Sequence, residues 1–145
     1  MIAAFVDTSV FLHAVGGEHP MRDSARVLLT RVADDLVVHI GAETVQEFIF
    51  HRVRVGRRDT ALTMGRELIE SVTIHPFDEK IARRAVELMS GSPIGGRDAV
   101  LAATALDAGF DAIVTDDAHF VSVGGLRVMN AADFLAAHPE TSAGH

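Results

Sequence analysis

The chain has 145 residues, of which 48% are hydrophobic and none is cysteine. This length fits one globular domain with a sizeable core, and the lack of cysteine excludes disulfides, thiolate zinc sites and cysteine nucleophiles. Thirteen basic residues against 20 acidic ones give a net charge of −7, which argues against a protein that coats nucleic acid by neutralising its phosphates.

The first forty residues predict two strands separated by helices. Residues 2–6 form an apolar run of strand length that ends at Asp7. Thr8 and Ser9 follow, and their hydroxyls are expected to cap a short helix. A second helix is expected before residues 36–40, which are rich in β-branched side chains and predict the next strand.

The rest of the chain alternates between helical and strand patterns. Asp59 and Asp78 each precede a helical pattern and are expected to cap it. Gly56 lies just beyond the end of another such pattern, as glycine often does. In chain order the predicted elements are a helix over 42–55, a helix after residue 59, a strand over 72–74, a helix after residue 78, a helix over 98–108, strands over 112–115 and 126–129, and a helix over 131–137.

This alternation predicts an α/β fold. Strands that alternate with helices pair in parallel through right-handed crossovers. We therefore expect a three-layer α/β/α domain over residues 1–138, with a mostly parallel central sheet between helices. Residues 139–145 are mostly polar or small and are expected to form a flexible C-terminal tail.

The sequence predicts neither a signal peptide nor a membrane span. The N-terminal apolar run lacks a preceding basic stretch and stops at a carboxylate. No window approaches the ~18 consecutive apolar residues of a spanning helix. We therefore expect a cytoplasmic protein with no membrane partner.

Four acidic residues stand where predicted elements meet. Asp7 ends the first strand, Glu47 lies inside the third helix, Asp98 opens a later helix, and Asp117 follows the fourth strand. Strand ends on one edge of a parallel sheet are where α/β folds place their ligand sites. Carboxylates gathered there repel one another unless a cation neutralises them. The pattern therefore indicates a divalent-metal site for phosphate chemistry.

Each of these acids also has a purely structural interpretation. Asp7 and Asp98 stand where a residue can cap or stabilise the start of a helix. Glu43 and Glu47 are four residues apart and so lie on one face of the third helix. Glu43 falls in the first turn, where the helix dipole favours any acid, whereas Glu47 borders an apolar stripe. We therefore favour Glu47 for the site.

Asp116 and Asp117 are adjacent, so on an extended backbone their side chains point in opposite directions. Only one of the two should then face a common pocket, and the structural alternative for the pair is a turn. Thr115 and Ser9 carry hydroxyls that can orient a carboxylate or a water beside a metal.

Carboxylates and water supply the oxygen ligands that hard cations such as Mg²⁺ or Mn²⁺ prefer. Such an ion lowers the pKa of a bound water and stabilises charge on a phosphoryl group. Other mechanisms fit poorly, because the chain has no H-E-x-x-H, G-x-S-x-G, G-x-G-x-x-G or G-x-x-x-x-G-K-[ST] motif.

Four segments together point to a known family. They are FVDTS at 5–9, VQEF at 45–48, RDAV at 97–100 with AATAL at 102–106 behind it, and VTDDAHF at 114–120. In order and spacing this set resembles the PIN-domain ribonucleases and, within them, the VapC toxins of bacterial type II toxin–antitoxin pairs. The resemblance runs from residue 2 to about residue 134, and the segments are specific jointly rather than singly.

The resemblance implies a catalytic set of Asp7, Glu47, Asp98 and Asp117, with Asp7, Asp98 and Asp117 holding the metal. It implies an Mg²⁺-dependent endoribonuclease, with Mn²⁺ as a substitute, that cuts single-stranded or loop regions of tRNA, rRNA or mRNA and so inhibits translation and growth. It also implies a homodimer and a small VapB-like antitoxin as partner. Whether Glu43 or Asp116 assists at the site stays open at this point.

Within this interpretation, Asp7 and Asp98 hold the metal most directly, Asp117 completes the shell, and Glu47 orients or deprotonates the attacking water. Replacing Asp7 or Asp98 by Asn is expected to abolish RNA cleavage. Thermal stability should stay equal or rise, because the substitution relieves carboxylate repulsion.

Arg97 and the arginines among residues 52–58 are candidates for contact with the RNA backbone, the alternative being a solvated helix face. Two other functions compete with the ribonuclease. A small-molecule phosphatase normally carries D-x-D at its first strand end, where this chain has Asp7 followed by Thr8-Ser9. A non-catalytic binding module would use the acidic pocket to receive an arginine-rich partner.

Overall fold

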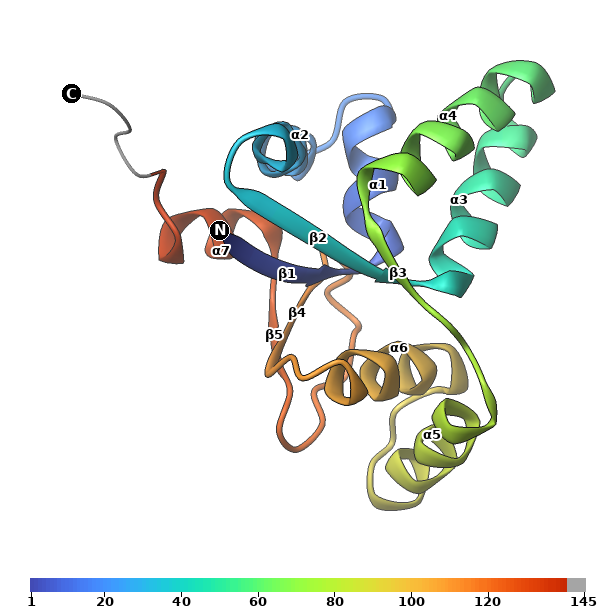
Figure 1. Cartoon of the computed structure of the whole chain (residues 1–145), viewed down its shortest axis with the longest axis vertical. Coiled ribbons are helices and arrows are strands. Elements are labelled where there is room, and N and C mark those ends of the chain that lie inside the picture. The colour runs from blue at the N-terminus through green and yellow to red at the C-terminus, as the bar shows by residue number, and fades with distance from the viewer. Residues whose placement is uncertain (141–145) are drawn as a thin grey trace.

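The computed structural model describes residues 1–140, and within them five strands form one parallel sheet in the order β3-β2-β1-β4-β5 (Figure 1). Each neighbouring pair is parallel, so all the carboxyl ends meet at one edge. The strands are β1 (Ile2–Val6), β2 (Leu36–Gly41), β3 (Thr73–His75), β4 (Ala112–Val114) and β5 (Arg127–Met129).

Helices cover both faces of this sheet (Figure 1). In that view α1, α2, α3 and α4 lie above the strands and α5 and α6 lie below, while α7 packs beside α2. The predicted three-layer α/β/α architecture is therefore confirmed. The helices are α1 (Thr8–Val15), α2 (Arg22–Thr30), the 3-10 turn η1 (Arg31–Ala33), α3 (Ala42–Val55), α4 (Arg58–Ser71), α5 (Glu79–Gly91), α6 (Gly96–Asp107) and α7 (Ala131–Ala137).

The sheet separates two hydrophobic clusters, because successive side chains of a strand point to opposite faces. Ala4 and Val6 of β1 belong to the cluster that α1, α2 and α3 cover. Phe5 belongs to the other cluster, together with Ile113 of β4 and the buried alanines of α6. Small side chains on α6 let its backbone lie close to the sheet, which brings the start of α6 towards the ends of β1 and β4.

Of three predicted helix caps, one agrees with the structure and two differ from it. Asp78 caps α5 as predicted, accepting from the N–H of Ile81 (3.0 Å). The cap of α1 is Asp7 rather than Thr8 or Ser9, because its carboxylate already reaches the N–H of Thr8. Asp59 is not a cap either, since α4 begins at Arg58 and Asp59 lies in its first turn.

Smaller shifts affect the ends of other elements. β3 runs one residue later than predicted, and α6 begins at Gly96 instead of residue 98. Arg97 and Asp98 are therefore both held in the first helical turn. None of the helices in residues 1–140 is long and apolar enough to cross a bilayer. Of the predicted tail over 139–145, residues 141–145 lie outside the part of the chain that is described.

Candidate active site

The carboxyl ends of β1 and β4 lie side by side and begin the site. Val6 pairs with Val114 in the parallel register, and the N–H of Asp7 donates to the carbonyl of Val114 (2.8 Å). Asp7 and Thr115, the first residues beyond these two strands, therefore occupy neighbouring positions. This is the edge at which α/β folds place their ligands.

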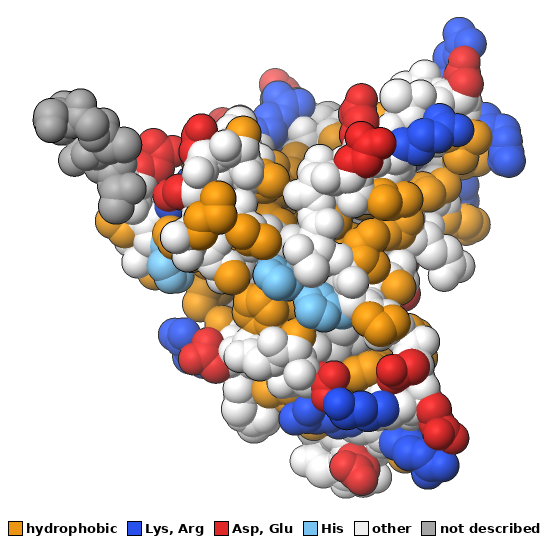
Figure 2. Space-filling model, in the orientation of Figure 1, with side chains coloured by type: hydrophobic (Ala, Val, Ile, Leu, Met, Phe, Trp, Pro, Cys, Tyr) orange, Lys and Arg blue, Asp and Glu red, His pale blue; other side chains and the backbone are white. Residues whose placement is uncertain are grey.

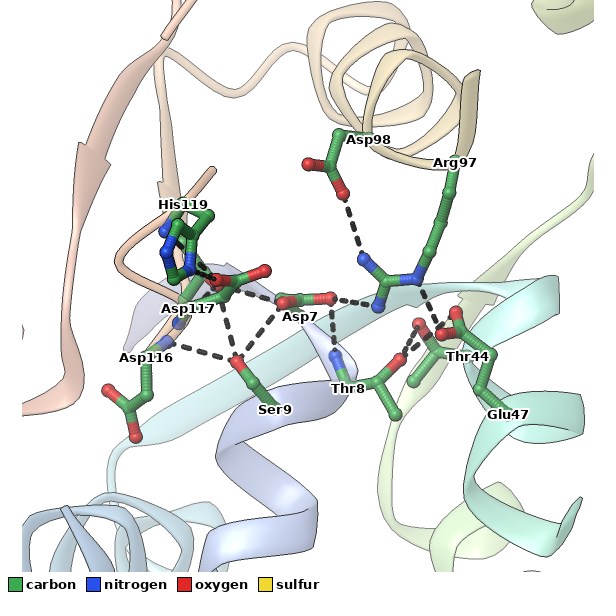
Figure 3. A network of polar contacts seen from close by, with 11 residues as sticks. Asp7, Thr8, Ser9, Thr44, Glu47, Arg97, Asp98, Asp116, Asp117 and His119 are labelled. Carbon is green, nitrogen blue, oxygen red and sulfur yellow. Dashed lines mark hydrogen bonds and ion pairs between the residues drawn. The ribbon is translucent and has the colours of Figure 1, made fainter. Parts of the chain in front are cut away.

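The carboxylate of Asp7 is fully buried and is held by several donors (Figure 3). The N–H of Thr8 donates to Oδ1 at 2.7 Å, and the hydroxyls of Thr115 and Ser9 donate to Oδ2 at 2.8 and 3.0 Å. These bonds fix the plane of the carboxylate. The sequence suggested this orienting role for the hydroxyls of Thr115 and Ser9. Because it is buried, Asp7 also needs a compensating positive charge.

Arg97 supplies that charge and joins three carboxylates from three elements (Figure 3). Its Nη2 donates to Asp7 (3.2 Å), its Nε to Glu47 (2.6 Å) and its Nη1 to Asp98 (2.8 Å). Burial works against the guanidinium charge, but the bond to Glu47 and the three carboxylate charges raise the pKa of Arg97 above its usual range. The sequence suggested Arg97 only as a contact for RNA.

Glu47 approaches the site from the second turn of α3. Besides its bond to Arg97, its Oε1 lies 3.3 Å from the hydroxyl of Thr8, which also contacts the hydroxyl of Thr44 (3.2 Å). The buried Thr44 is one turn before Glu47 on the same helix face. Sequence reasoning missed both threonines, although the spacing of Thr44 to Glu47 was a signal that could have identified one of them.

Asp98 and Asp117 complete the acidic group with less burial than Asp7. The pKa of Asp98 is raised by its burial and, more weakly, by the charges of Asp7 and Asp117, while Arg97 opposes this. Asp117 is bonded differently, since its Oδ1 accepts from the N–H of His119 (2.9 Å). The structure thus gathers Asp7, Glu47 and Asp98 around Arg97 and places Asp117 beside them.

The side chain of Asp116 points away from this group, as expected for a neighbour of Asp117 on extended backbone (Figure 3). Its Oδ1 accepts from the N–H of Ala131 (3.0 Å), at the start of α7, and its Oδ2 lies 3.3 Å from Nδ1 of His13. Asp116 therefore ties α7 and α1 to the end of β4, which is a structural role.

Glu43 has a different environment from Glu47. Both oxygens of its carboxylate are buried and have no hydrogen-bond partner among residues 1–140. Burial, with a smaller contribution from the charge of Glu47, raises the pKa of Glu43. Arg97 bonds to Glu47 and not to Glu43. Glu47 is also the acid that the sequence analysis favoured for the site.

The basic residues of 52–58 lie away from the acidic group. They occupy the last turn of α3 and the start of α4, and Figure 2 shows basic side chains, in blue, gathered at that end of the two helices. Arg57 is paired with Asp59 (3.0 Å), and Arg54 lies over the ring of Phe50. A contact of these residues with RNA stays a prediction.

The donor set of the acidic group suits a hard divalent cation. It consists of carboxylate oxygens, with hydroxyls behind them, and this is the chemistry that Mg²⁺ and Mn²⁺ prefer. Within residues 1–140, no three acidic or histidine side chains converge in ligating geometry. The place between Asp7 and Asp98 is taken instead by the guanidinium of Arg97. The oxygen donors of this group therefore suit a divalent cation, and the guanidinium of Arg97 provides a positive charge among them.

The sequence of this chain is similar to those of known proteins. Residues 4–126 match the model of the PIN domain family. The ribonuclease VapC7 of Mycobacterium tuberculosis is 35% identical over 122 residues, which cover 81% of this chain and 84% of that protein. The chain belongs to the PIN domain family, as the resemblance predicted, and its relatives include VapC ribonucleases.

Solved structures share the fold at lower sequence identity. VapBC2 from Rickettsia felis, bound to a DNA fragment from its promoter, superposes with a TM-score of 0.68 and 20% identity, covering 90% of this chain and 98% of the other. A toxin–antitoxin complex from Klebsiella pneumoniae superposes with a TM-score of 0.66 and 19% identity, covering 85% and 94%. The chain therefore shares its fold with a chain in each of these two structures.

Proposed function

We propose that this protein is a divalent-cation-dependent endoribonuclease and the toxin of a type II toxin–antitoxin pair, which hydrolyses RNA phosphodiester bonds and so inhibits translation and growth. The observation that carries the proposal is the convergence of Asp7, Glu47 and Asp98 on one positive charge at the carboxyl edge of β1. Similarity to a named VapC ribonuclease over most of both chains supports it.

Asp7 and Asp98 would hold the cation, with Asp117 completing the shell. When bound, a Mg²⁺ or Mn²⁺ ion polarises the phosphoryl group and lowers the pKa of a water. The contribution of the chain is to fix the ligands in advance, since the hydroxyls of Thr115 and Ser9 orient Asp7 before any substrate arrives.

We assign to Glu47 the removal of the proton from the attacking water. Its side chain is partly exposed (29%), so a water can reach it, and the hydroxyl of Thr8 holds its Oε1. The water oxygen then forms a bond to phosphorus as the bond to the leaving sugar oxygen breaks. A carboxylate that hydrogen-bonds to this water would act as its general base.

The substrate we propose is a single-stranded or loop region of tRNA, rRNA or mRNA. In such regions the backbone can bend into a site at a sheet edge, whereas bases and phosphates of a regular helix are harder to reach. The basic residues of 52–58 are then candidates for contact with phosphates outside the site. Mapping new 5′ ends in cellular RNA after induction of the protein alone would identify the cleavage position.

The proposed partners are a small VapB-like antitoxin and a second copy of this chain, in the cytoplasm. Likeness of fold to proteins crystallised as toxin–antitoxin complexes supports the antitoxin. Co-expression with the neighbouring small gene product should restore growth that induction of this chain alone arrests. The mass of the purified protein in solution tests the dimer.

One assay separates the ribonuclease from the two rival functions. The purified protein is incubated with RNA and, separately, with p-nitrophenyl phosphate, each with Mg²⁺. Cleavage of RNA alone is the expected result. Hydrolysis of p-nitrophenyl phosphate alone would indicate a phosphatase, and no hydrolysis of either would favour a binding module.

A further inference from the structure

Arg97 is bound in a way that distinguishes it from a structural arginine. Its hydrogen bonds within residues 1–140 go only to carboxylates, and its side chain is 44% exposed at the mouth of the site. Arg31 is the contrast, because its side chain is 1% exposed and it also bonds to a backbone carbonyl, that of His138. The polar contacts that hold the guanidinium of Arg97 in its place are therefore all with acidic side chains.

The guanidinium of Arg97 lies between the two carboxylates that we propose as cation ligands, those of Asp7 and Asp98. Its Nη2 and Nη1 lie within hydrogen-bond distance of Oδ1 of Asp7 and Oδ1 of Asp98. A Mg²⁺ ion binds its oxygen ligands at about 2.0–2.1 Å. An ion bound to these two oxygens would therefore leave no room for the guanidinium nitrogens that contact them now. A guanidinium and a divalent cation also repel each other, so the two cannot contact the same carboxylate oxygens together.

We infer that Arg97 is a built-in competitor of the cation, and that cation binding moves its guanidinium outward, where it binds a phosphate of the substrate next to the metal. The inference rests on the proposed function for the identity of the cation and the substrate. A guanidinium fork matches a phosphate as well as it matches a carboxylate. Its partial exposure gives it a route outward without displacement of the core.

Cation affinity without RNA tests the first half of the inference. Titration calorimetry with Mn²⁺ compares the wild type with Arg97→Gln, Arg97→Lys and Arg83→Gln. Arg97→Gln should bind at least about tenfold tighter, since it removes the competitor, and Arg97→Lys should lie between, because one ammonium cannot bridge three carboxylates. Arg83→Gln loses the same charge from an exposed position on α5 and should match the wild type. Unchanged or weaker binding by Arg97→Gln would overturn the inference.

Movement of the guanidinium has its own signal. The Nε–H resonance of Arg97 in a ¹⁵N-labelled sample is assigned by its loss in Arg97→Gln. It should shift with Mg²⁺ in step with occupancy of the site. A resonance that stays in place at saturating Mg²⁺ would contradict the exchange, whatever the activity of the enzyme.

Kinetics test the contact with phosphate. At saturating Mg²⁺, Arg97→Gln should raise KM for RNA about tenfold or more with a smaller change in kcat, and Arg97→Lys should recover part of the loss. An unchanged KM would reject the phosphate contact. If the wild type cleaves no RNA, the proposed function fails, while the calorimetric and resonance results still decide whether cation and arginine exchange.

Discussion

A single buried carboxylate, that of Asp7, links the fold to the proposed chemistry. It caps α1, it lies beside the end of β4, and it accepts from Thr115, Ser9 and Thr8. Such outer partners of a metal ligand matter because they fix its orientation. Substitution of one typically costs about 10–100-fold in metal affinity or activity.

Thr115→Val removes one of these donors while keeping the shape of the side chain. RNA cleavage should fall by about 10–100-fold and stability by about 1 kcal/mol, because Oδ2 of Asp7 loses its 2.8 Å donor. Measurements of kcat/KM and Tm check this. Thr104→Val is the control, since Thr104 is equally buried but bonds to the carbonyl of Val100 inside α6. Equal losses of activity in both variants would contradict the account.

Asp7→Asn and Asp98→Asn should have opposite effects on stability. Relief of carboxylate repulsion alone would predict an equal or higher Tm for both variants. Asp7→Asn should lower Tm, because Asn places an amide among donors and loses the pair with Arg97. Burial raises the pKa of Asp98, so its charged form is disfavoured in the folded state, and Asp98→Asn should keep or raise Tm at pH 7. Thermal melts of both variants without metal decide this, and a higher Tm for Asp7→Asn would restore the simple repulsion picture.

At the scale of elements, α3 and α4 form a helical pair that depends on a close approach. Gly65 of α4 is buried against Ile49 of α3, and a Cβ at residue 65 would lie 2.8 Å from Cγ1 of Ile49. This contact holds α3, and α3 carries Glu47. The close approach at Gly65 therefore supports the site from a distance.

Gly65→Ala should destabilise the protein by about 1 kcal/mol, because overpacking costs ~1–3 kcal/mol and the gain in helix propensity returns ~1 kcal/mol. In an Ile49→Ala background the clash is gone, so the same substitution should stabilise by up to about 1 kcal/mol. Urea unfolding of the four proteins of this cycle measures the two effects. The same sign in both backgrounds would show that the contact does not limit packing.

The elements that the sequence predicted well are those with a strong local pattern. The apolar run before Asp7 and the alternating order of strands and helices led directly to a parallel sheet with acids at its carboxyl edge. The helix caps were harder to predict from the sequence. Asp7 and Thr8 are both good capping residues, and only the directions of their side chains decide between them. Where Arg97 points depends on how α6 lies against β1, and a local pattern contains no such information.

At the scale of the whole molecule, Arg31 joins segments from both ends of the described chain. It is almost fully buried, it pairs with Asp35 (2.7 Å), and it donates to the carbonyl of His138 after α7. No sequence pattern marked it, because a buried arginine is recognised only from the elements that surround it. This clamp attaches α7 to the layer of α2.

The clamp predicts a dependence of stability on pH. The hydrogen bond from Arg31 lowers the pKa of Asp35, so the ionised carboxylate stabilises the folded state at neutral pH. That contribution is lost as the pH falls below about 4 and Asp35 takes up a proton. The stability difference between wild type and Asp35→Asn should therefore shrink towards pH 3 in urea unfolding. Asp34→Asn, at an exposed neighbour, should show no such trend, and a constant difference for Asp35→Asn would contradict the clamp.

The most direct test of the proposed site is metal-dependent RNA cleavage by the wild type and by Asp7→Asn and Asp98→Asn. We expect cleavage by the wild type with Mg²⁺, none after EDTA, recovery when Mg²⁺ is added back, and a loss of at least about a hundredfold in either variant. Cleavage that survives EDTA, or that both variants retain, would contradict a catalytic cation held by these carboxylates.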